Sequence, residues 1–159
     1  MQVKLFSEDF SPLAEMASYE AARPTSKADI GANAIFIGTM REFNEGSRVS
    51  AMTLEHYPGM TEKELSKILK EAESSWPIKD GLICHRIGDV LPGSALVLVA
   101  IWSTHRAEAF EACRFVMEEL KSRAPFWKKE RLPAGDRWVE KNTCGHTDAG
   151  SPSNTDAPD

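Results

Sequence analysis

The sequence has little cysteine and no long apolar run, and both shortages exclude classes of protein. Its three cysteines, Cys84, Cys113 and Cys144, are an odd number and form no Cys-x-x-Cys pair. This usage indicates reduced thiols rather than a disulfide framework, and it predicts a cytoplasmic location. No stretch of about 18 apolar residues is present to span a membrane. The first ten residues include Glu8 and Asp9 and lack the apolar segment of a secretory signal.

A surplus of positive charge is also missing. Lys and Arg number 19 against 24 Asp and Glu, which gives a net charge of −5. A general nucleic-acid binder needs the opposite balance, so that class is excluded. The apolar share of 42% and the charged share of 27% are those of a globular protein. A chain of 159 residues is expected to form one domain that buries roughly 70% of its unfolded surface.

The C-terminal residues 142–159 lack apolar side chains. They contain no Val, Ile, Leu, Met, Phe, Tyr or Trp. A segment with so little to bury cannot offset the entropy lost on ordering, so we predict a disordered polar tail. The folded domain is then expected to comprise residues 1–141.

Short strands alternate with helices in the predicted domain. Strands are expected at residues 3–6, 33–38, 49–57, 82–90 and 95–102, with a closing strand near 138–139. Ser11 and Pro12 open a helix to about Glu20, and Thr61 with Glu64 forms a capping-box pattern for a second helix. Residues 39–48 are predicted to be a polar loop. A type II turn at residues 91–94 should join two antiparallel strands, so we expect an α+β fold with a largely antiparallel or mixed sheet.

The longest helix is predicted to follow Ser103 or Thr104 as its N-cap and to end before Pro125. Apolar residues at helical spacing form its expected buried stripe: Ala109, Phe110, Cys113, Val116, Met117 and Leu120. Lys121 borders this stripe, so its ammonium group should be partly desolvated. The turn at Pro125 is expected to bring Lys128 back toward Lys121.

Cationic groups therefore flank both ends of this helix. His105 and Arg106 lie at its start, Lys121 in its last turn, and Lys128 and Lys129 beyond the turn. Positive charge gathered beside apolar surface in an acidic protein indicates a site for a small anionic substrate, held away from bulk water.

Each of these residues has an ordinary structural alternative. A lysine at a helix C-terminus usually complements the helix dipole, and adjacent lysines in a loop are usually solvated. Arg41 would likewise be a surface charge in its polar loop. Cys84 and Cys113 are best interpreted as packed thiols, and His85 as a structural residue of its strand. Only the combined pattern favours a functional site.

Five segments together resemble the large, catalytic subunit of molybdopterin synthase. They are GTMREFNEG, LEHYPGMTEKEL, HRIGDVLPG, STHRAEAFEAC and LKSRAPFWKKE, and the similarity extends from about Leu5 to Val139. The resemblance implies an α/β-hammerhead-like fold with an additional small sheet. It also implies a homodimer within a heterotetramer, in which each subunit accepts the C-terminal Gly-Gly thiocarboxylate of a small ubiquitin-like partner. Sulfur from that tail would pass to cyclic pyranopterin monophosphate and form the dithiolene of molybdopterin, as part of molybdenum cofactor biosynthesis.

The resemblance also implies roles for particular residues. Lys121 and Lys128 would be catalytic. The residues implied to bind substrate are Thr39, Met40, Arg41, His105, Arg106, Lys121, Lys128, Lys129 and Glu130. Neither a metal nor a redox cofactor is required by the implied reaction. Two other classes stay open on the residues alone: a non-catalytic module that docks a partner's tail in a basic groove, and a different phosphoryl- or acyl-transfer enzyme.

Truncation after Lys141 should leave the domain intact. Residues 142–159 offer no apolar side chain beyond Ala and Cys for packing, so the melting temperature should be nearly unchanged. Differential scanning calorimetry of the full and truncated chains measures this. A fall of several degrees would show that the tail packs on the domain.

Overall fold

The computed structural model describes residues 1–23, 27–44, 47–133 and 135–139. A four-stranded sheet, here the main sheet, runs through the middle of the domain in the order β1-β6-β8-β2. Its strands are β1 (Gln2–Phe6), β2 (Ala32–Thr39), β6 (Ile78–Arg86) and β8 (Ala95–Ser103). The β1–β6 pair is parallel and the others are antiparallel, so the sheet is mixed.

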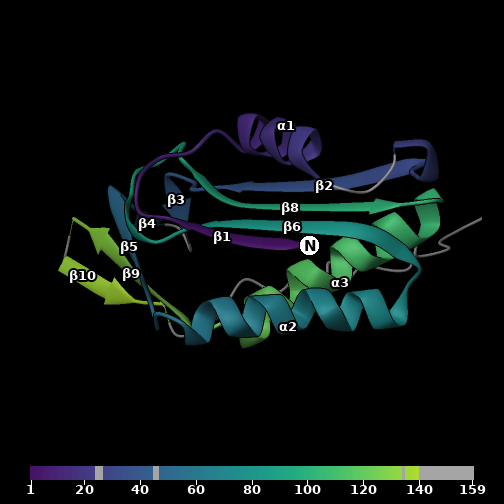
Figure 1. Ribbon diagram of the computed structural model, residues 1–159. Helices are drawn as coiled ribbons and strands as arrows, with labels where there is room; N and C mark the ends of the chain where they lie inside the picture. Colours follow the sequence, from purple (N-terminus) through teal and green to yellow (C-terminus); the bar gives the residue numbers. More distant parts are fainter. Residues whose placement is uncertain (24–26, 45–46, 134, 140–159) are drawn as a thin grey trace, which may run out of the picture.

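A second four-stranded sheet lies at one end of the main sheet and has the order β10-β9-β5-β7 (Figure 1). Its strands are β5 (Ala51–His56), β7 (Gly88–Val90), β9 (Phe126–Leu132) and β10 (Gly135–Trp138), all antiparallel. The short strands β3 (Phe43–Asn44) and β4 (Ser47–Arg48) pair with each other. The predicted α+β class, with a further small sheet, is confirmed.

Helices cover both faces of the main sheet (Figure 1). Helix α1 (Pro12–Ala22) lies on one face, and α2 (Met60–Ser75) and α3 (Arg106–Arg123) lie on the other. A 3-10 turn, η1 (Lys27–Asp29), precedes β2. In the described part of the chain, no helix combines the length and apolarity needed to cross a bilayer.

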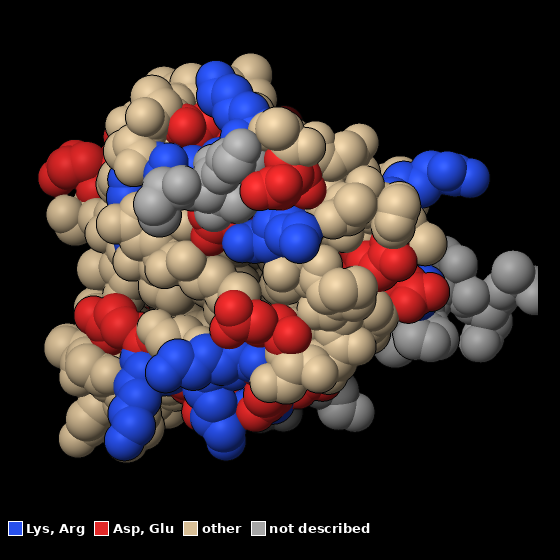
Figure 2. Space-filling view, turned by 45° about the vertical axis from the view of Figure 1, so that its right-hand side comes forward, with Lys and Arg blue, Asp and Glu red and all other residues tan. Residues whose placement is uncertain are grey.

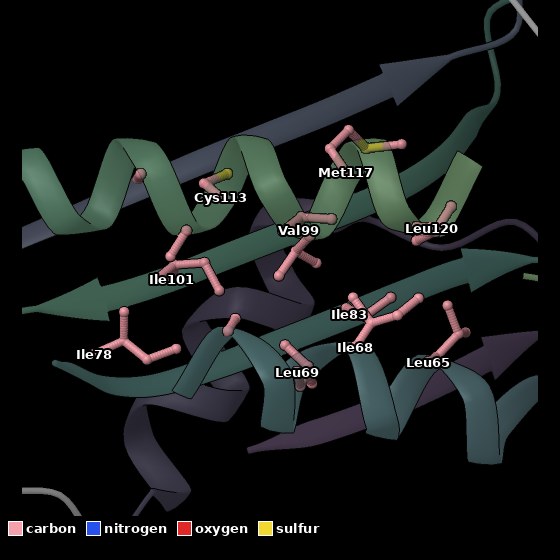
Figure 3. Packing of buried hydrophobic residues seen from close by; sticks show 14 of the residues in the cluster. Leu65, Ile68, Leu69, Ile78, Ile83, Val99, Ile101, Cys113, Met117 and Leu120 are labelled. Carbon is pink, nitrogen blue, oxygen red and sulfur yellow. The ribbon is translucent and has the colours of Figure 1, made fainter. Parts of the chain in front are cut away.

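The larger core cluster fills the space between the main sheet and the helices α2 and α3. Figure 3 shows Leu65, Ile68 and Leu69 of α2 directed toward Ile83, Val99 and Ile101 of the sheet. Strand β8 lies between β6 and β2 and is buried from Val97 to Ser103, so both of its faces are covered. Burial of the aliphatic side chains in this cluster, each worth about 1.5–3 kcal/mol, fixes both α2 and α3 on the sheet.

Both cap predictions for the long helices are wrong by one or two residues. Helix α2 is capped at Gly59, whose N–H donates to Glu62 Oε2 at 2.7 Å, rather than at Thr61. Helix α3 is capped at His105. Of the two cationic residues expected at the helix start, Arg106 is therefore in the first turn and His105 precedes it. The predicted N-cap Ser11 of α1 is confirmed, because its hydroxyl accepts from the Ala14 N–H.

Two predicted elements and the predicted burial of one side chain differ from the structure. The expected strand 82–90 divides at Ile87 into β6 and β7, which enter different sheets; Gly88, with φ of +75°, accommodates the bend. The expected loop 39–48 contains the β3–β4 pair. Phe110 was expected in the buried stripe but is 64% exposed. The predicted type II turn is supported by Gly93 at φ +90° and by the bond from Ser94 N to Leu91 O.

A buried polar contact ties α1 to the main sheet. The Tyr19 hydroxyl donates to Asp80 Oδ1 at 2.7 Å, and the Gly81 N–H and the Met1 amino group also contact this carboxylate. Burial alone would raise the pKa of Asp80, but these donors outweigh it and lower the pKa. Asp80 therefore stabilises the fold above its unfolded pKa of about 4, and this contribution is lost as the pH falls through its lower folded pKa.

Tyr19→Phe should lower the free energy of unfolding by about 1.5–3 kcal/mol at pH 7, because it removes a buried hydrogen bond to a charged group. The matched control is Tyr57→Phe, at the chain's other tyrosine, which is 59% exposed and should change stability by less than about 0.5 kcal/mol. Urea denaturation measures both. The Tyr19→Phe effect should begin to shrink as the pH falls below the unfolded Asp80 pKa of about 4. Equal losses in the two variants at pH 7 would contradict the assignment.

Candidate functional site

A cavity of about 670 Å³ opens where α3 ends between the main and second sheets. Six of the residues predicted to form a site line it: Thr39, Met40, Arg41, Lys121, Lys128 and Glu130. Apolar side chains from the same elements form much of the remaining wall, among them Phe36, Met117, Leu120 and Phe126. The cavity thus combines cationic groups with apolar surface, as the sequence pattern predicted.

Lys121 and Lys128 reach this cavity from two separate elements. Lys121 lies in the last turn of α3, directly after the buried Leu120. Pro125 then ends the helical path, and β9 begins at Phe126. Alternate residues of a strand share a face, so Phe126, Lys128 and Glu130 all point toward the cavity. The predicted return of Lys128 toward Lys121 is confirmed.

Burial and charge act together on Lys128. Burial lowers the pKa of its ammonium group, and the positive charge of Lys121 lowers this pKa further. The negative charge of Glu130 opposes both effects. An amine with a lowered pKa can exchange protons more readily near neutral pH.

Glu130 is a buried carboxylate with fixed geometry, only 5% exposed. Its Oε1 accepts from the Asn44 side chain at 2.6 Å, and its Oε2 accepts from Arg137 at 2.8 Å. These partners come from β3 and β10, so three strands position one charge. Neither Asn44 nor Arg137 was singled out from the sequence, because only the pairing of distant strands brings them to Glu130.

A second ionic cluster fixes the C-terminal end of α3. The Arg123 guanidinium binds Glu64 and Glu71 of α2 and Glu119 of its own helix. Hydrogen bonds from Arg123 lower the pKa of Glu71, and the three carboxylates raise the pKa of Arg123. This clamp lies two residues after Lys121 and therefore restrains the helical turn that carries it.

The remaining predicted site residues do not line the cavity. His105 and Arg106 are exposed at the opposite end of α3, and the 15 steps along the helix from Arg106 to Lys121 span about 22 Å. Lys129 lies on the other face of β9, where its ammonium group pairs with Asp136 at 3.0 Å and lies over the Trp138 ring. One chain therefore assembles only part of the predicted site.

The two described cysteines are packed thiols. Burial raises the pKa of Cys84 to about 12 and that of Cys113 to about 11. A protonated, buried thiol is a poor nucleophile, so the structural interpretation of both residues is supported. Cys144 and the predicted tail lie outside the described residues, and the predicted domain boundary at 141 stays a prediction.

Charges on the surface do not gather into one broad field on the face seen in Figure 2. Lys and Arg side chains there alternate with Asp and Glu in small groups. This mixture is unlike the continuous basic surface that binds nucleic-acid backbones. The concentration of positive charge that matters chemically is inside the cavity, where a low dielectric strengthens it.

The sequence matches the family model of the MoaE protein over residues 8–123. A protein of Ralstonia nicotianae named molybdopterin synthase catalytic subunit is 51% identical over 138 residues, which cover 87% of this chain and 76% of that protein.

Solved structures also resemble this chain in fold. The molybdopterin biosynthesis MoaE protein from Burkholderia ambifaria is 48% identical and superimposes with a TM-score of 0.72, covering 87% of this chain and 88% of that one. A Helicobacter pylori structure, described as a complex of subunits 1 and 2 of molybdopterin-converting factor, has a TM-score of 0.72 at 18% identity and covers 89% and 92% of the two chains. That last likeness shows the shared fold alone.

Lys121→Met should raise the pKa of Lys128, because it removes the nearby positive charge that lowers it. Glu130→Gln should lower the same pKa, because it removes the opposing negative charge. NMR titration of reductively ¹³C-methylated lysines reports each ammonium group directly. Lys129→Met, on the opposite face of β9, is the control and should leave the Lys128 titration in place; a Lys128 pKa insensitive to Lys121 would show that the two groups do not share the cavity.

Proposed function

Because this chain belongs to the MoaE family of molybdopterin synthase catalytic subunits, we propose that it transfers sulfur to cyclic pyranopterin monophosphate within its cavity. The sulfur donor is the C-terminal thiocarboxylate of a small ubiquitin-like partner subunit. The chain is an enzyme of the sulfurtransferase type, and its product carries the dithiolene of molybdopterin. The observation that carries the proposal is the convergence of Arg41, Lys121 and Lys128 on one partly apolar cavity.

The charges of the cavity suit two anionic reactants. A cyclic phosphate and a thiocarboxylate repel each other, and this repulsion grows as water is excluded. Arg41 offers a planar fork for phosphate oxygens, while Lys121 and Lys128 act as point charges. Glu130 opposes the fall in the Lys128 pKa and thereby favours its charged form. We assign Glu130 to holding this cation rather than to contacting the anion.

The reaction requires two kinds of step. The terminal thiocarboxylate sulfur replaces an oxygen on a pterin side-chain carbon: a C–S bond forms while a C–O bond at that carbon breaks, and the oxygen leaves as water at one carbon or stays on the phosphate as its ring opens at the other. The partner's tail is then linked to the pterin as a thioester. Water then cleaves the acyl–sulfur bond, so the tail leaves with an ordinary carboxylate and the sulfur stays on the pterin. Each dithiolene therefore consumes two thiocarboxylated tails. The ammonium groups of Lys121 and Lys128 stabilise the charge that develops in these steps, and Lys128 is suited to move protons.

The sulfur must come from outside the chain's described thiols. Cys84 and Cys113 are buried and protonated, so neither can carry a transferable sulfur to the cavity. An extended, anionic C-terminal tail can instead enter the opening and place its terminal charge beside the lysines. Subunits 1 and 2 in the Helicobacter pylori structure form a complex, which agrees with such a partner. We place this activity in the cytoplasm, where thiols stay reduced.

A homodimer explains why the predicted site is divided. Strand β2 is an edge strand with Ile35, Phe36 and Ile37 exposed by 43%, 41% and 39%, which favours a cover by another chain. Its first residue pairs with Ser103, near the start of α3, whereas its last residues, Gly38 and Thr39, line the cavity.

The direction of β2 predicts what such a dimer would bring together. If two copies of β2 pair about a two-fold axis, they run antiparallel, and the N-terminal end of each strand lies beside the C-terminal end of the other. His105 and Arg106 of a second copy then approach the cavity of the first. The complete site would hold Arg41, Lys121 and Lys128 from one subunit and the two helix-start residues from the other.

Reconstitution tests the activity itself. The chain, a thiocarboxylated small partner and cyclic pyranopterin monophosphate should together yield the dithiolene product, and a partner ending in an ordinary carboxylate should yield none. A variant with Cys84→Ala, Cys113→Ala and Cys144→Ser should keep most of the activity when folded. If this folded, partner-binding variant were inactive, a protein thiol would be the sulfur carrier. A docking module would bind the tail and form no product.

Subunit mixing tests the divided site. Lys121→Ala should lower turnover by about 10²–10⁴-fold, as expected for loss of acid–base catalysis, and His105→Ala should also lower turnover. Random mixing of the two variants gives half mixed dimers, each with one intact site, so activity should recover to about a quarter of wild type. A double variant that carries both changes is the control, because its dimers contain no intact site. No recovery would show that His105 does not complete the site of another subunit.

A further inference from the structure

His85 is a buried histidine in the wall of the cavity. It lies near the end of β6, pairs with Val97 of β8, and is only 6% exposed. Its ring stacks on Phe126 of β9, with ring centroids 4.0 Å apart and an angle of 13° between the planes. Because Phe126 and Lys128 share one face of β9, this stack places the imidazole beside the cationic wall.

One hydrogen bond determines which ring nitrogen carries the hydrogen. His85 Nδ1 lies 2.7 Å from the carbonyl oxygen of Arg86. A carbonyl oxygen only accepts, so Nδ1 carries the hydrogen and Nε2 keeps its lone pair. Within the described residues, the ring makes this one hydrogen bond. Nε2 is not fully shielded from solvent, so a bound molecule can reach it. His85 lines the cavity, and Nε2 is the ring nitrogen left to accept a hydrogen bond from a molecule bound there.

The surroundings keep this ring uncharged. Burial lowers the pKa of His85 to about 4, and the positive charge of Lys128 lowers it too, against the effect of the Arg86 carbonyl. Lys121 of α3 faces the same cavity with a second positive charge, while the residues paired with His85 in β1 and β8, Leu5 and Val97, are apolar. A neutral ring in this setting presents an acceptor within a cavity otherwise rich in donors.

We propose that His85 Nε2 accepts a hydrogen bond from a ring N–H of the bound pterin and so fixes the orientation of the heterocycle. This assignment rests on the proposed function, because it takes a cyclic pterin phosphate as the occupant. The phosphate end of that substrate is matched by Arg41 and the lysines. A reduced pterin also carries N–H groups along its ring edge, and those need an acceptor. Among nearby groups, Glu130 already accepts from Asn44 and Arg137.

Orientation matters because two carbons of one side chain must receive sulfur. An acceptor at a fixed point in the cavity distinguishes the N–H edge of the heterocycle from its carbonyl edge. The stack on Phe126 and the bond to Arg86 hold the imidazole in place, which preserves that distinction from one turnover to the next. His85 is therefore a residue of substrate recognition.

Two substitutions separate the acceptor from the packing. His85→Phe keeps a flat ring on Phe126 and removes the acceptor, so the Kd for cyclic pyranopterin monophosphate should rise about three- to tenfold. His85→Gln loses the stack but retains an amide oxygen, so its Kd should rise less. Isothermal titration without the partner subunit measures binding without turnover. Both variants should bind the small partner as wild type does. A folded His85→Phe variant with wild-type affinity for the pterin phosphate would overturn the proposal.

NMR of the unaltered chain labelled with ¹⁵N-histidine decides the question even if both variants fold poorly. The His85 signals should be those of a neutral ring at pH 7, because burial lowers the pKa of His85 to about 4. Adding cyclic pyranopterin monophosphate should shift the Nε2 resonance upfield, whereas inorganic phosphate, the control for charge alone, should not. An unchanged Nε2 resonance in chain saturated with the pterin phosphate would refute the role of His85. Failure of the chain to bind the pterin phosphate at all would instead refute the proposed function.

Discussion

Two ammonium groups share one partly buried cavity, and the surrounding fold must hold them there against their mutual repulsion. Lys121 and Lys128 would move apart if their backbones were free to do so. Each is instead carried by an element fixed elsewhere: α3 by its packing on the main sheet and by the Arg123 clamp, β9 by pairing on both sides within the second sheet. The packing of the two sheets thus holds the two lysines together against their electrostatic repulsion.

A negative charge in the same cavity, that of Glu130, reduces this repulsion. Glu130 lies on the face of β9 that carries Lys128, and Asn44 and Arg137 hold its carboxylate in one orientation. A carboxylate with both oxygens occupied is a poor competitor for the lysine ammonium groups, so it can moderate the positive charge without neutralising it. The neutral His85 ring follows the same logic, because a further cation there would add to the repulsion.

Much of the fold follows from local patterns. The strands at 33–38 and 95–102, the Ser11 cap and the buried stripe around Cys113 and Val116 were predictable, because apolar periodicity and capping depend on neighbours in the chain. Predictions failed where long-range contacts override local preference. The strand expected at 82–90 is divided between two sheets, and Phe110 is exposed although its spacing matches the stripe. Which sheet each half of the strand joins is decided by pairing with strands far away in the chain.

The sequence by itself determined which chemical groups the site contains, since cations, a carboxylate and apolar side chains in a recurring order identify a family and its chemistry. Tertiary structure decided which of those groups meet. It joined Lys121, Lys128 and Arg41, placed His105 and Arg106 a helix length away, and brought Asn44, Arg137 and His85 into contact with the site. The physical reason is that side-chain chemistry is local, whereas proximity depends on strand pairing and helix packing between residues far apart in the chain.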